Sequence, residues 1–431
     1  MKIAIIGGAG VRTPLLVNGL AQSDLPIDEI ALFDIDQTRL RIIGALAAER
    51  GSAVRLHDDV RSCVAGADFV LLSIRVGGIA ARARDEAVAV AHDVAGQETV
   101  GPGGFAMAMR TIPHAIEYAR LVEREAPSAW TVSFTNPVGI VTQAMTSATN
   151  ARVVGICDTP TELFEDVTHV LGVESAGCTF DYFGLNHLGW LREVYAEREP
   201  LLQRIWSRHD LLRRVYRAPL FDVEFLERLR LLPTEYLYYY YCPERALANL
   251  RKAGRTRGES IVGLNDRLFA DLAGAPDSAT RRRIYETYVA ARSAGYMQIE
   301  SGASQPIAAT PRAALTGYDK IALSVLHAIH FNTSAALPLN VPNRGTISEL
   351  ADDDVVEVPC VVNAEGPRPV GPVPVPPAVR DLLVRVKGYE RLTVAAAASR
   401  SAADIERALA ANPLVRDGGH ASRLAAALGP W

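Results

Sequence analysis

Cysteine is scarce in this sequence, and it has neither long apolar runs nor a large excess of one charge. The 431 residues contain five cysteines, at 63, 157, 178, 242 and 360, an odd number scattered along the chain. We therefore expect no disulfide framework and a reducing, cytoplasmic location. No uncharged run reaches membrane-spanning length, and a glycine turn begins at residue 7, too early for a signal peptide. The formal net charge of −4 argues against nucleic acid or an acidic membrane as the main partner.

The composition is that of a globular protein, because 49% of the residues are hydrophobic and 22% are charged. Up to residue 185, short apolar runs alternate with helical patterns, which predicts an α/β fold with a doubly wound parallel, Rossmann-like sheet. The expected strands are 2–6, 29–33, 53–57, 69–73, 130–134 and 153–156, and the expected helices include 14–22, 59–66 and 137–147. Later helical stretches fall at 199–217, 218–230, 277–291 and 311–331, and a proline-rich segment, 367–377, is typical of an extended surface loop. We expect two domains, 1–190 and 191–431, of which the second has a mixed α+β structure.

The first predicted strand runs into the turn Gly7-Gly8-Ala9-Gly10-Val11-Arg12-Thr13, and a helix follows. Glycines at such a turn let the backbone approach a pyrophosphate held at the helix N-terminus. The second strand ends at Asp34, near the offset at which an acid binds an adenosine ribose. Thr13 replaces the last glycine of the usual G-x-G-x-x-G pattern. The pattern predicts a dinucleotide site, and a carboxylate at Asp34 favours NAD over NADP.

Two potential metal ligands follow later apolar runs. Cys157 stands at the end of the predicted strand 153–156, and His187 follows a second apolar run. Ligands bind at the carboxyl ends of strands in an open parallel sheet, so the two side chains could share a metal. A buried cysteine is more often a small hydrophobic residue, so the pair alone is a weak signal.

Polar residues also crowd the segments 75–86, 96–99 and 101–113, which follow the fourth strand and which we expect to be loops that help to form a site. They include Arg75, Arg82, Arg84 and Arg110, close to glycine-rich backbone. A single arginine there would be a solvated side chain, whereas several beside glycines suit an anionic substrate.

Taken in order, these motifs resemble glycoside hydrolase family 4. The resemblance runs from residue 1 to about 400, and within the family the chain most resembles the 6-phospho-β-glucosidases. The motifs that carry it are Gly7-Gly8 with Thr13-Pro14, Arg75 with Gly77-Gly78, Gly96-Gln-Glu-Thr99, Gly103-Gly104 with Arg110, Phe134-Thr-Asn-Pro137, Gly155-Ile-Cys157, Gly184-Leu-Asn-His187 and Val356-Glu-Val-Pro-Cys360. The resemblance implies an NAD-binding domain like that of lactate and malate dehydrogenases, a substrate domain, and a homodimer or homotetramer.

It also implies a chemistry that differs from two-carboxylate glycoside hydrolysis. NAD⁺ would take a hydride from C3 of the sugar, and a divalent metal, usually Mn²⁺, would stabilise the enediolate formed when C2 loses its proton. The leaving group would then depart from C1, water would add, and the hydride would return. The expected substrates are small phosphorylated disaccharides or aryl glucosides, such as cellobiose 6-phosphate.

Residue by residue, the resemblance implies a set of site residues. Cys157 and His187 match the metal ligands, and Tyr236, which begins the run Tyr236-Leu-Tyr-Tyr-Tyr-Tyr241, matches the base at C2. Gly8, Gly10, Val11, Arg12, Thr13 and Asp34 fall at cofactor positions. Asn136 matches a contact to both sugar and nicotinamide, and Arg82 and Arg255 match arginines on the 6-phosphate. Asp158 falls where phospho-α-glucosidases carry a proposed catalytic acid.

The sequence departs from the family pattern in two further places and leaves alternatives open. Val11-Arg12 stands where many members have a Ser-x-Tyr-like sequence, and Arg292-Ser-Ala-Gly-Tyr296 replaces a more usual Arg-Gly-Gly segment. A 6-phospho-α-glucosidase is one alternative, because of Asp158. An NAD-dependent hydroxy-acid dehydrogenase, with His187 as a proton relay, is another, and a catalytically silent NAD sensor is the alternative that is not an enzyme.

Overall fold

A nine-stranded sheet forms the centre of the computed structural model, which describes residues 1–51, 53–303 and 317–430. The strand order in these residues is β13-β12-β11-β6-β5-β4-β1-β2-β3. The strands from β1 to β6 are parallel, and β11, β12 and β13 extend the sheet antiparallel beyond β6. Their bounds are β1 (Lys2–Ile6), β2 (Glu29–Phe33), β3 (Val54–His57), β4 (Phe69–Leu72), β5 (Trp130–Ser133), β6 (Arg152–Gly155), β11 (Ala335–Pro342), β12 (Val355–Asn363) and β13 (Gly366–Pro369). The predicted doubly wound parallel sheet is confirmed.

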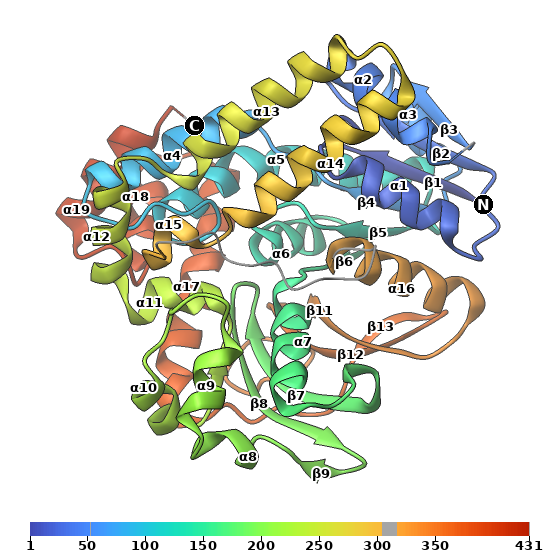
Figure 1. Cartoon of the computed structure of the whole chain (residues 1–431). Coiled ribbons are helices and arrows are strands. Elements are labelled where there is room, and N and C mark those ends of the chain that lie inside the picture. The colour runs from blue at the N-terminus through green and yellow to red at the C-terminus, as the bar shows by residue number, and fades with distance from the viewer. Residues whose placement is uncertain (52, 304–316, 431) are drawn as a thin grey trace.

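Helices cover both faces of the parallel strands, which explains why the strands are apolar throughout. Ile3 and Ile5 of β1 belong to one apolar cluster, and Ala4 and Ile6 belong to another on the opposite face. The covering helices are α1 (Thr13–Gln22), α2 (Gln37–Ala48), α3 (Val60–Val64), α4 (Gly78–Ala91), α5 (Gly101–Glu125) and α6 (Val138–Ala148). Figure 1 shows them around the blue and teal strands.

The prediction of loops over 75–86 and 101–113 is wrong, because most of these residues form the first turns of α4 and α5. The glycines there allow close packing. A Cβ on Gly103 would lie 2.2 Å from the carbonyl oxygen of Gln97, and one on Gly104 would lie 2.3 Å from that of Thr99. Helix α5 can therefore begin in close contact with the backbone of segment 97–99.

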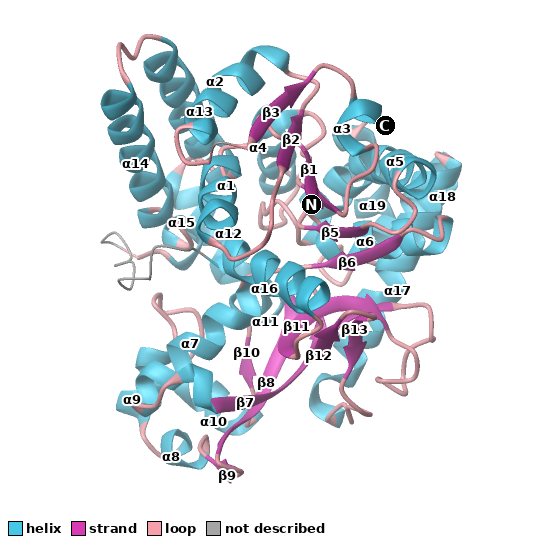
Figure 2. Ribbon diagram, turned by 90° about the vertical axis from the view of Figure 1, so that its right-hand side faces the viewer, coloured by secondary structure: helices cyan, strands magenta, loops and turns pink. Residues whose placement is uncertain are grey.

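A second, four-stranded sheet lies below the first in Figure 2. It consists, in the described residues, of β7 (Cys178–Leu185), β8 (Leu188–Ala196), β9 (Glu199–Pro200) and β10 (Leu232–Pro233). Around it lie α7 (Thr159–Leu171), α8 (Gln203–Trp206), α9 (His209–Val215), α10 (Val223–Leu229), α11 (Tyr238–Tyr241) and α12 (Pro243–Ala253), with the short 3-10 helices η1 (Ser175–Gly177) and η2 (Glu235–Leu237). Residue 190 lies within β8, so the division at 190 stays a prediction.

The remaining helices pack on the first sheet and its flanks. A long antiparallel pair, α13 (Arg257–Ala273) and α14 (Ser278–Ala294), folds back over α2 at the top of Figure 1. The others are α15 (Gln298–Ser301), α16 (Gly317–Phe331), α17 (Pro377–Ser399), α18 (Ala402–Ala411) and α19 (Gly418–Leu428). No helix in the described ranges is long and apolar enough to span a membrane.

Several predicted boundaries need correction. The stretch 199–217 is not one helix, because β9 opens it and two short helices follow; in 218–230 only Val223–Leu229 is helical. The described part of the helix expected over 311–331 is Gly317–Phe331, and residues 311–316 lie outside the described ranges. The segment 367–377 is not wholly loop, since β13 extends to Pro369.

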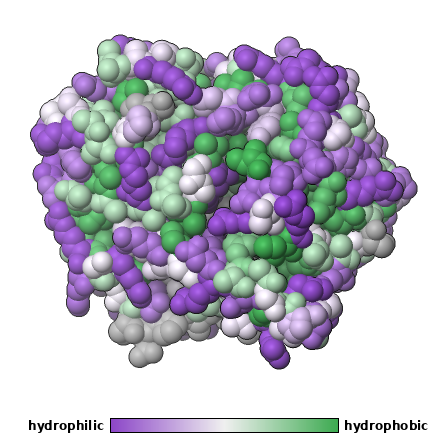
Figure 3. All heavy atoms as spheres, turned by 90° about the horizontal axis from the view of Figure 1, so that it is seen from above, coloured by the Kyte–Doolittle hydropathy of each residue, from purple (hydrophilic) through white to green (hydrophobic). Residues whose placement is uncertain are grey.

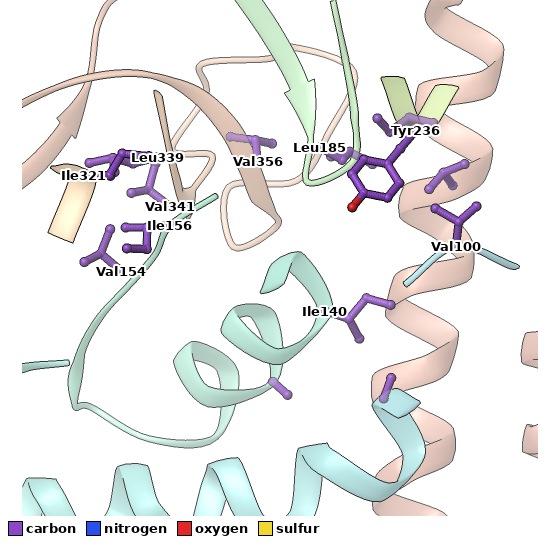
Figure 4. Close-up of a cluster of buried hydrophobic side chains, with 14 of the residues drawn as sticks. Val100, Ile140, Val154, Ile156, Leu185, Tyr236, Ile321, Leu339, Val341 and Val356 are labelled. Carbon is purple, nitrogen blue, oxygen red and sulfur yellow. The ribbon is translucent and has the colours of Figure 1, made fainter. Parts of the chain in front are cut away.

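One large apolar cluster joins the two halves of the chain. It contains Ile3 from the first strand and Leu428 from the last helix. Figure 4 shows part of it, with Val154 and Ile156 beside Leu339 and Val341. The surface seen from above in Figure 3 is mainly hydrophilic, with hydrophobic residues in small groups.

Candidate functional site

A cavity of about 760 Å³ lies beyond the carboxyl ends of the parallel strands. Its wall is formed by the glycine turn, by the ends of β4 and β5, by the start of α7, by η2 and by the α13–α14 pair. This is where a doubly wound sheet binds its ligands. Among the predicted site residues it is lined by Gly10, Val11, Arg12, Arg82, Asn136, Asp158 and Tyr236.

The glycine turn has the shape expected of a dinucleotide site. Gly7 has a φ of +93°, and a Cβ there would lie 2.0 Å from the carbonyl oxygen of Ser73. The amide groups of Gly7 and Gly8 both donate to the carbonyl oxygen of Phe33, at 2.9 and 2.8 Å. Gly8 and Thr13 are buried beside the cavity rather than in its wall. The turn thus presents backbone at Gly10 and Val11 to the cavity.

Asp34 sits at the end of β2, against this turn. Its Oδ2 accepts from the amide of Ala9 at 3.0 Å, and its Oδ1 accepts from the amide of Asp36 at 3.0 Å. Burial raises the pKa of Asp34 despite these hydrogen bonds. The carboxylate is therefore fixed at the edge of the turn, as the sequence pattern predicts.

His187 occupies the tight connection between β7 and β8, with a φ of +61°. Its Nδ1 lies 2.6 Å from the hydroxyl oxygen of Thr99. That hydroxyl donates to Oε1 of Gln97 at 2.8 Å, so the proton shared with the imidazole belongs to Nδ1. Burial lowers the pKa of His187 to about 4. The ring is neutral at physiological pH, and its Nε2 lone pair is available to a metal.

Cys157 follows β6 and is fully buried. Burial and the charge of Glu357 hold the pKa of its thiol well above the usual value. Glu357 is itself fixed, because it accepts hydrogen bonds from Tyr182 at 2.7 Å, Asn340 at 2.8 Å and Asn186 at 3.2 Å. Within the described ranges no three His, Cys, Asp or Glu side chains form a metal-binding group. A metal held by Cys157 and His187 would need further ligands from substrate or water.

Tyr236 lies in η2 and is only 7% exposed. Its ring stacks on the imidazole of His187, with centroids 3.8 Å apart and planes 11° apart. Burial, with the nearby charges of Glu235 and Glu98, raises the pKa of its phenol well above 10. Its hydroxyl oxygen lies 3.1 Å from that of Tyr296, which also contacts Glu235. In Figure 4 Tyr236 lies beside Leu185, close to the strand that leads to His187.

The arginines of the site fall into two groups. Arg82 is buried and already paired, since its Nε lies 2.7 Å from Glu86 and its Nη1 lies 2.7 Å from Glu98. Arg257 and Arg292 also line the cavity, but neither forms an ion pair with a carboxylate in the described part of the chain. Burial lowers the pKa of both, to about 10 for Arg292.

Arg255 is a predicted site residue that the structure leaves away from the site. It is exposed and does not line the cavity, whereas Arg257, two residues later, does. Arg257 is the first residue of α13, whose start is fixed by a capping box between Thr256 and Glu259. That capping signal, Thr-x-x-Glu, is visible in the sequence and could have located the helix start.

Asn136 and Asp158 complete the wall near the strand ends. Oδ1 of Asn136 is buried and has no hydrogen-bond partner among the described residues, which indicates a position for a ligand donor. Asp158 precedes α7 and lies 3.7 Å from Nη1 of Arg12. Sequence reasoning did not assign a role to Thr99, Glu235 or Tyr296, although each lies in or beside a motif.

The architecture is that of a dehydrogenase-like α/β protein. A solved structure of a lactate dehydrogenase enzyme from a Medee basin deep-sea metagenome library shares the fold at 12% identity, with a TM-score of 0.54, and the match covers 92% of this chain and 98% of that one. Models of protein families match the sequence more specifically than this likeness of fold. The model for family 4 glycosyl hydrolase matches residues 2–173, and the model for its C-terminal domain matches residues 182–415. The chain belongs to family 4 of the glycosyl hydrolases.

Relatives in this family carry names of both anomeric types. A probable 6-phospho-beta-glucosidase of Bacillus subtilis (strain 168) is 30% identical over 96% of this chain and 92% of its own length. The structure of the 6-phospho-beta glucosidase from Thermotoga maritima with manganese, NAD⁺ and glucose-6-phosphate matches at 25% identity and a TM-score of 0.81, covering 99% of this chain and 97% of that one. A 6-phospho-alpha-glucosidase from gut microorganisms, in complex with NAD and Mn²⁺, matches at 26% identity with the same TM-score of 0.81 and the same coverage of 99% and 97%.

Proposed function

We propose that this protein hydrolyses 6-phosphoglucosides and requires NAD and a divalent metal, Mn²⁺ above others. The observation that carries the proposal is the stacking of Tyr236 on a neutral His187 whose Nε2 is left for a metal. A phenol beside a metal ligand suits removal of a proton from a carbon that the metal activates. The names of the relatives and their complexes support the same activity.

The residues present fit a bound NAD. The close approach of Gly7 to Ser73 and the fixed carboxylate of Asp34 form the cradle, and the unpaired Oδ1 of Asn136 can accept from a ligand. Gly10, Val11 and Arg12, which line the cavity, would contact the pyrophosphate, and Gly8 and Thr13 would support the turn from behind. Because Asp34 carries negative charge where NADP carries its 2′-phosphate, the proposal includes a preference for NAD.

Cys157 and His187 are proposed to hold the divalent metal beside the cavity, whose wall contains Tyr236 stacked on His187 but neither ligand itself. The imidazole is oriented by Thr99 and needs no deprotonation, and the thiol would lose its proton on binding. Mn²⁺ prefers oxygen ligands, so sugar hydroxyls would complete the coordination. The metal would then occupy the site fully only when substrate is present.

Arg257 and Arg292 are proposed to bind the 6-phosphate. Both line the cavity without a carboxylate partner, whereas Arg82 is neutralised by Glu86 and Glu98. The charges of Glu300 and Glu98 act on these guanidinium groups without a close ion pair in the described residues, so a phosphate could still bind both directly. Arg82 then acts mainly by holding Glu98 in the wall. Burial alone would raise the pKa of the Glu98 carboxyl, but the charges of Arg75 and Arg82 outweigh this effect and keep that pKa below its usual value.

These placements define how the chain would act on the sugar. When bound, NAD⁺ and the metal would supply reversible oxidation at C3 and polarisation of the sugar oxygens. The two arginines hold the substrate through its phosphate, Tyr236 takes the proton from C2, and the buried wall excludes bulk water from these atoms. Loss of the C2 proton releases the group at C1, and Tyr236 returns a proton to C2 after water has added.

We propose the β-anomer, as in cellobiose 6-phosphate, as the preferred substrate. The α-anomer is the second candidate, and the position of Asp158 in the cavity wall favours it. A carboxyl at this point could protonate a leaving group that departs from the α face.

The test is an assay of aryl 6-phospho-α- and 6-phospho-β-glucosides with NAD⁺, Mn²⁺ and a thiol reductant. We expect aglycone release that is faster for the β-anomer, is lost with a chelator, and is restored by Mn²⁺. NADH should not accumulate, because the hydride returns to the sugar. Stoichiometric NADH would instead identify a simple dehydrogenase, and turnover without NAD⁺ or metal would refute the proposal.

A further inference from the structure

The hydroxyl of Tyr236, a side chain that is only 7% exposed, leads to two further groups. It lies 3.1 Å from the hydroxyl of Tyr296, which is hydrogen-bonded to Oε1 of Glu235. Tyr296 stands just beyond α14, and Glu235 directly precedes Tyr236 in η2, so the contact joins two segments 60 residues apart. All three side chains line the cavity.

The direction of these hydrogen bonds follows from counting protons. An ionised Glu235 can only accept, so the single hydroxyl proton of Tyr296 points to it. When Glu235 is ionised and takes the proton of Tyr296, the 3.1 Å contact between the two tyrosine hydroxyls is left to the hydroxyl proton of Tyr236, which then donates to the oxygen of Tyr296. The three groups therefore form a chain along which protons run from Tyr236 towards Glu235.

A tyrosine that acts as a base at this position needs a group that accepts its hydroxyl proton. The phenol is buried, and it would have to lose its own proton before or while it takes one from carbon. We propose that Tyr296 and Glu235 form the proton relay that accepts the hydroxyl proton of Tyr236 when Tyr236 removes the C2 proton. The inference rests on the proposed function and adds two residues to its chemistry.

The transfer balances without any further reagent. The C2–H bond breaks and its electron pair stays on the sugar, while the proton joins the oxygen of Tyr236. The former hydroxyl proton of Tyr236 passes to the oxygen of Tyr296, whose own proton passes to the carboxylate of Glu235. The reverse sequence returns a proton to C2 later in the cycle, and the 36% exposure of Tyr296 gives the relay contact with solvent.

The surroundings of Glu235 suit a group that stores a proton. Burial, followed by the charge of Glu162, raises its pKa to about 8, and Asp158 acts in the same direction. The hydrogen bond from Tyr296 and the charge of Arg217 act in the opposite direction. Above about pH 8 the carboxyl is ionised and accepts, and below that pH it is already protonated. Turnover should therefore rise with pH through this value.

The relay is tested with Tyr296→Phe, which keeps the ring, and Glu235→Gln, which keeps the shape of the side chain. In each variant we expect kcat to fall about tenfold or more with little change in KM, and the deuterium isotope effect at C2 to grow. The pH limb near 8 should disappear in Glu235→Gln. The double variant should be no slower than the slower single variant, because both changes break one chain. Tyr195→Phe, a tyrosine of β8 outside the cavity, is the matched control.

A readout that needs no turnover comes from the infrared spectrum of the protein without metal. We expect the band of a protonated carboxyl group that titrates near pH 8, and we expect this band to be missing from Glu235→Gln. Circular dichroism and NAD⁺ binding check that the variants fold. Variants with wild-type kcat, isotope effect and pH profile would overturn the relay while leaving the proposed function intact. A wild-type enzyme that releases no aglycone would overturn both.

Discussion

Two arginines that are two positions apart, Arg255 and Arg257, have different surroundings. Arg255 is exposed, and Arg257 is buried in the cavity wall, where its guanidinium contacts the carbonyl oxygen of Arg292. A charge-assisted contact to phosphate contributes about 1.5–3 kcal/mol, which corresponds to roughly a 10- to 150-fold change in affinity. Arg255 and Arg257 thus allow the same substitution to be compared at an exposed and at a buried position.

We expect Arg257→Lys to raise KM for a 6-phosphoglucoside by about tenfold, because lysine keeps the charge but loses the planar, bidentate geometry. Arg255→Lys should leave KM unchanged. Steady-state kinetics on the same substrate, with folding checked by circular dichroism, measures both. If Arg255→Lys is the variant with the raised KM, the phosphate is bound outside this part of the wall.

At the residue scale, a motif that fixes the backbone also fixes the position of its residues. The glycine turn and Asp34 follow strand ends, where the backbone has little freedom, and Tyr236 lies in η2 against His187, while the roles assigned to these residues stay predictions. Arg255 shows the limit, since it precedes α13 and is exposed, whereas Arg257, two residues later, is buried. The contact between Tyr296 and Glu235 joins distant segments, and no local pattern reports it.

At the scale of elements, the α13–α14 pair is built into the cofactor side of the cavity. Tyr285 of α14 donates to the carbonyl oxygen of Val11 at 2.7 Å, and Leu268 and Leu272 of α13 pack with Leu46 of α2. The pair therefore supports the glycine turn from the side opposite the sheet. Sequence reasoning placed α14 correctly within a few residues but could not assign its partner, because packing between helices leaves no local signature.

We expect Tyr285→Phe to weaken NAD⁺ binding and to lower stability by about 1 kcal/mol, since it leaves the partly buried carbonyl of Val11 without its donor. Calorimetric titration with NAD⁺ and urea unfolding measure the two effects. Tyr195→Phe, on β8, should change neither. Unchanged binding and stability in Tyr285→Phe would show that α14 does not support the turn.

The apparent loops after β4 show why element boundaries were misjudged. Glycines at 77, 78, 103 and 104 are typical of turns, but here they lie at the starts of helices, and those at 103 and 104 let α5 approach backbone closely. The α5 helix even contains Pro113. Tertiary contact overrides local propensity at these positions, and a single sequence does not show the contact.

At the scale of the whole molecule, the two halves that the sequence pattern separates share one sheet and one core. Asn340 of β11 pairs with Gly155 of β6, and β11 and β12 come from the second half of the chain. Val154 and Ile156, from the first half, are covered by residues that follow position 320 in the chain, among them Leu339 and Val341. Each such buried aliphatic side chain contributes roughly 1.5–3 kcal/mol, so neither half retains its core without the other.

We therefore expect the protein to unfold as one cooperative unit rather than as two domains. Scanning calorimetry should give a single transition whose calorimetric and van't Hoff enthalpies are equal. NAD⁺ should raise the temperature of the whole transition. A fragment of residues 1–190 should remain unfolded or aggregate, because its β6 edge and the apolar face around Val154 and Ile156 would be exposed. Independent domains divided at 190 would give a different result. Calorimetry would then resolve two transitions, NAD⁺ would shift only one of them, and the fragment would be soluble and folded.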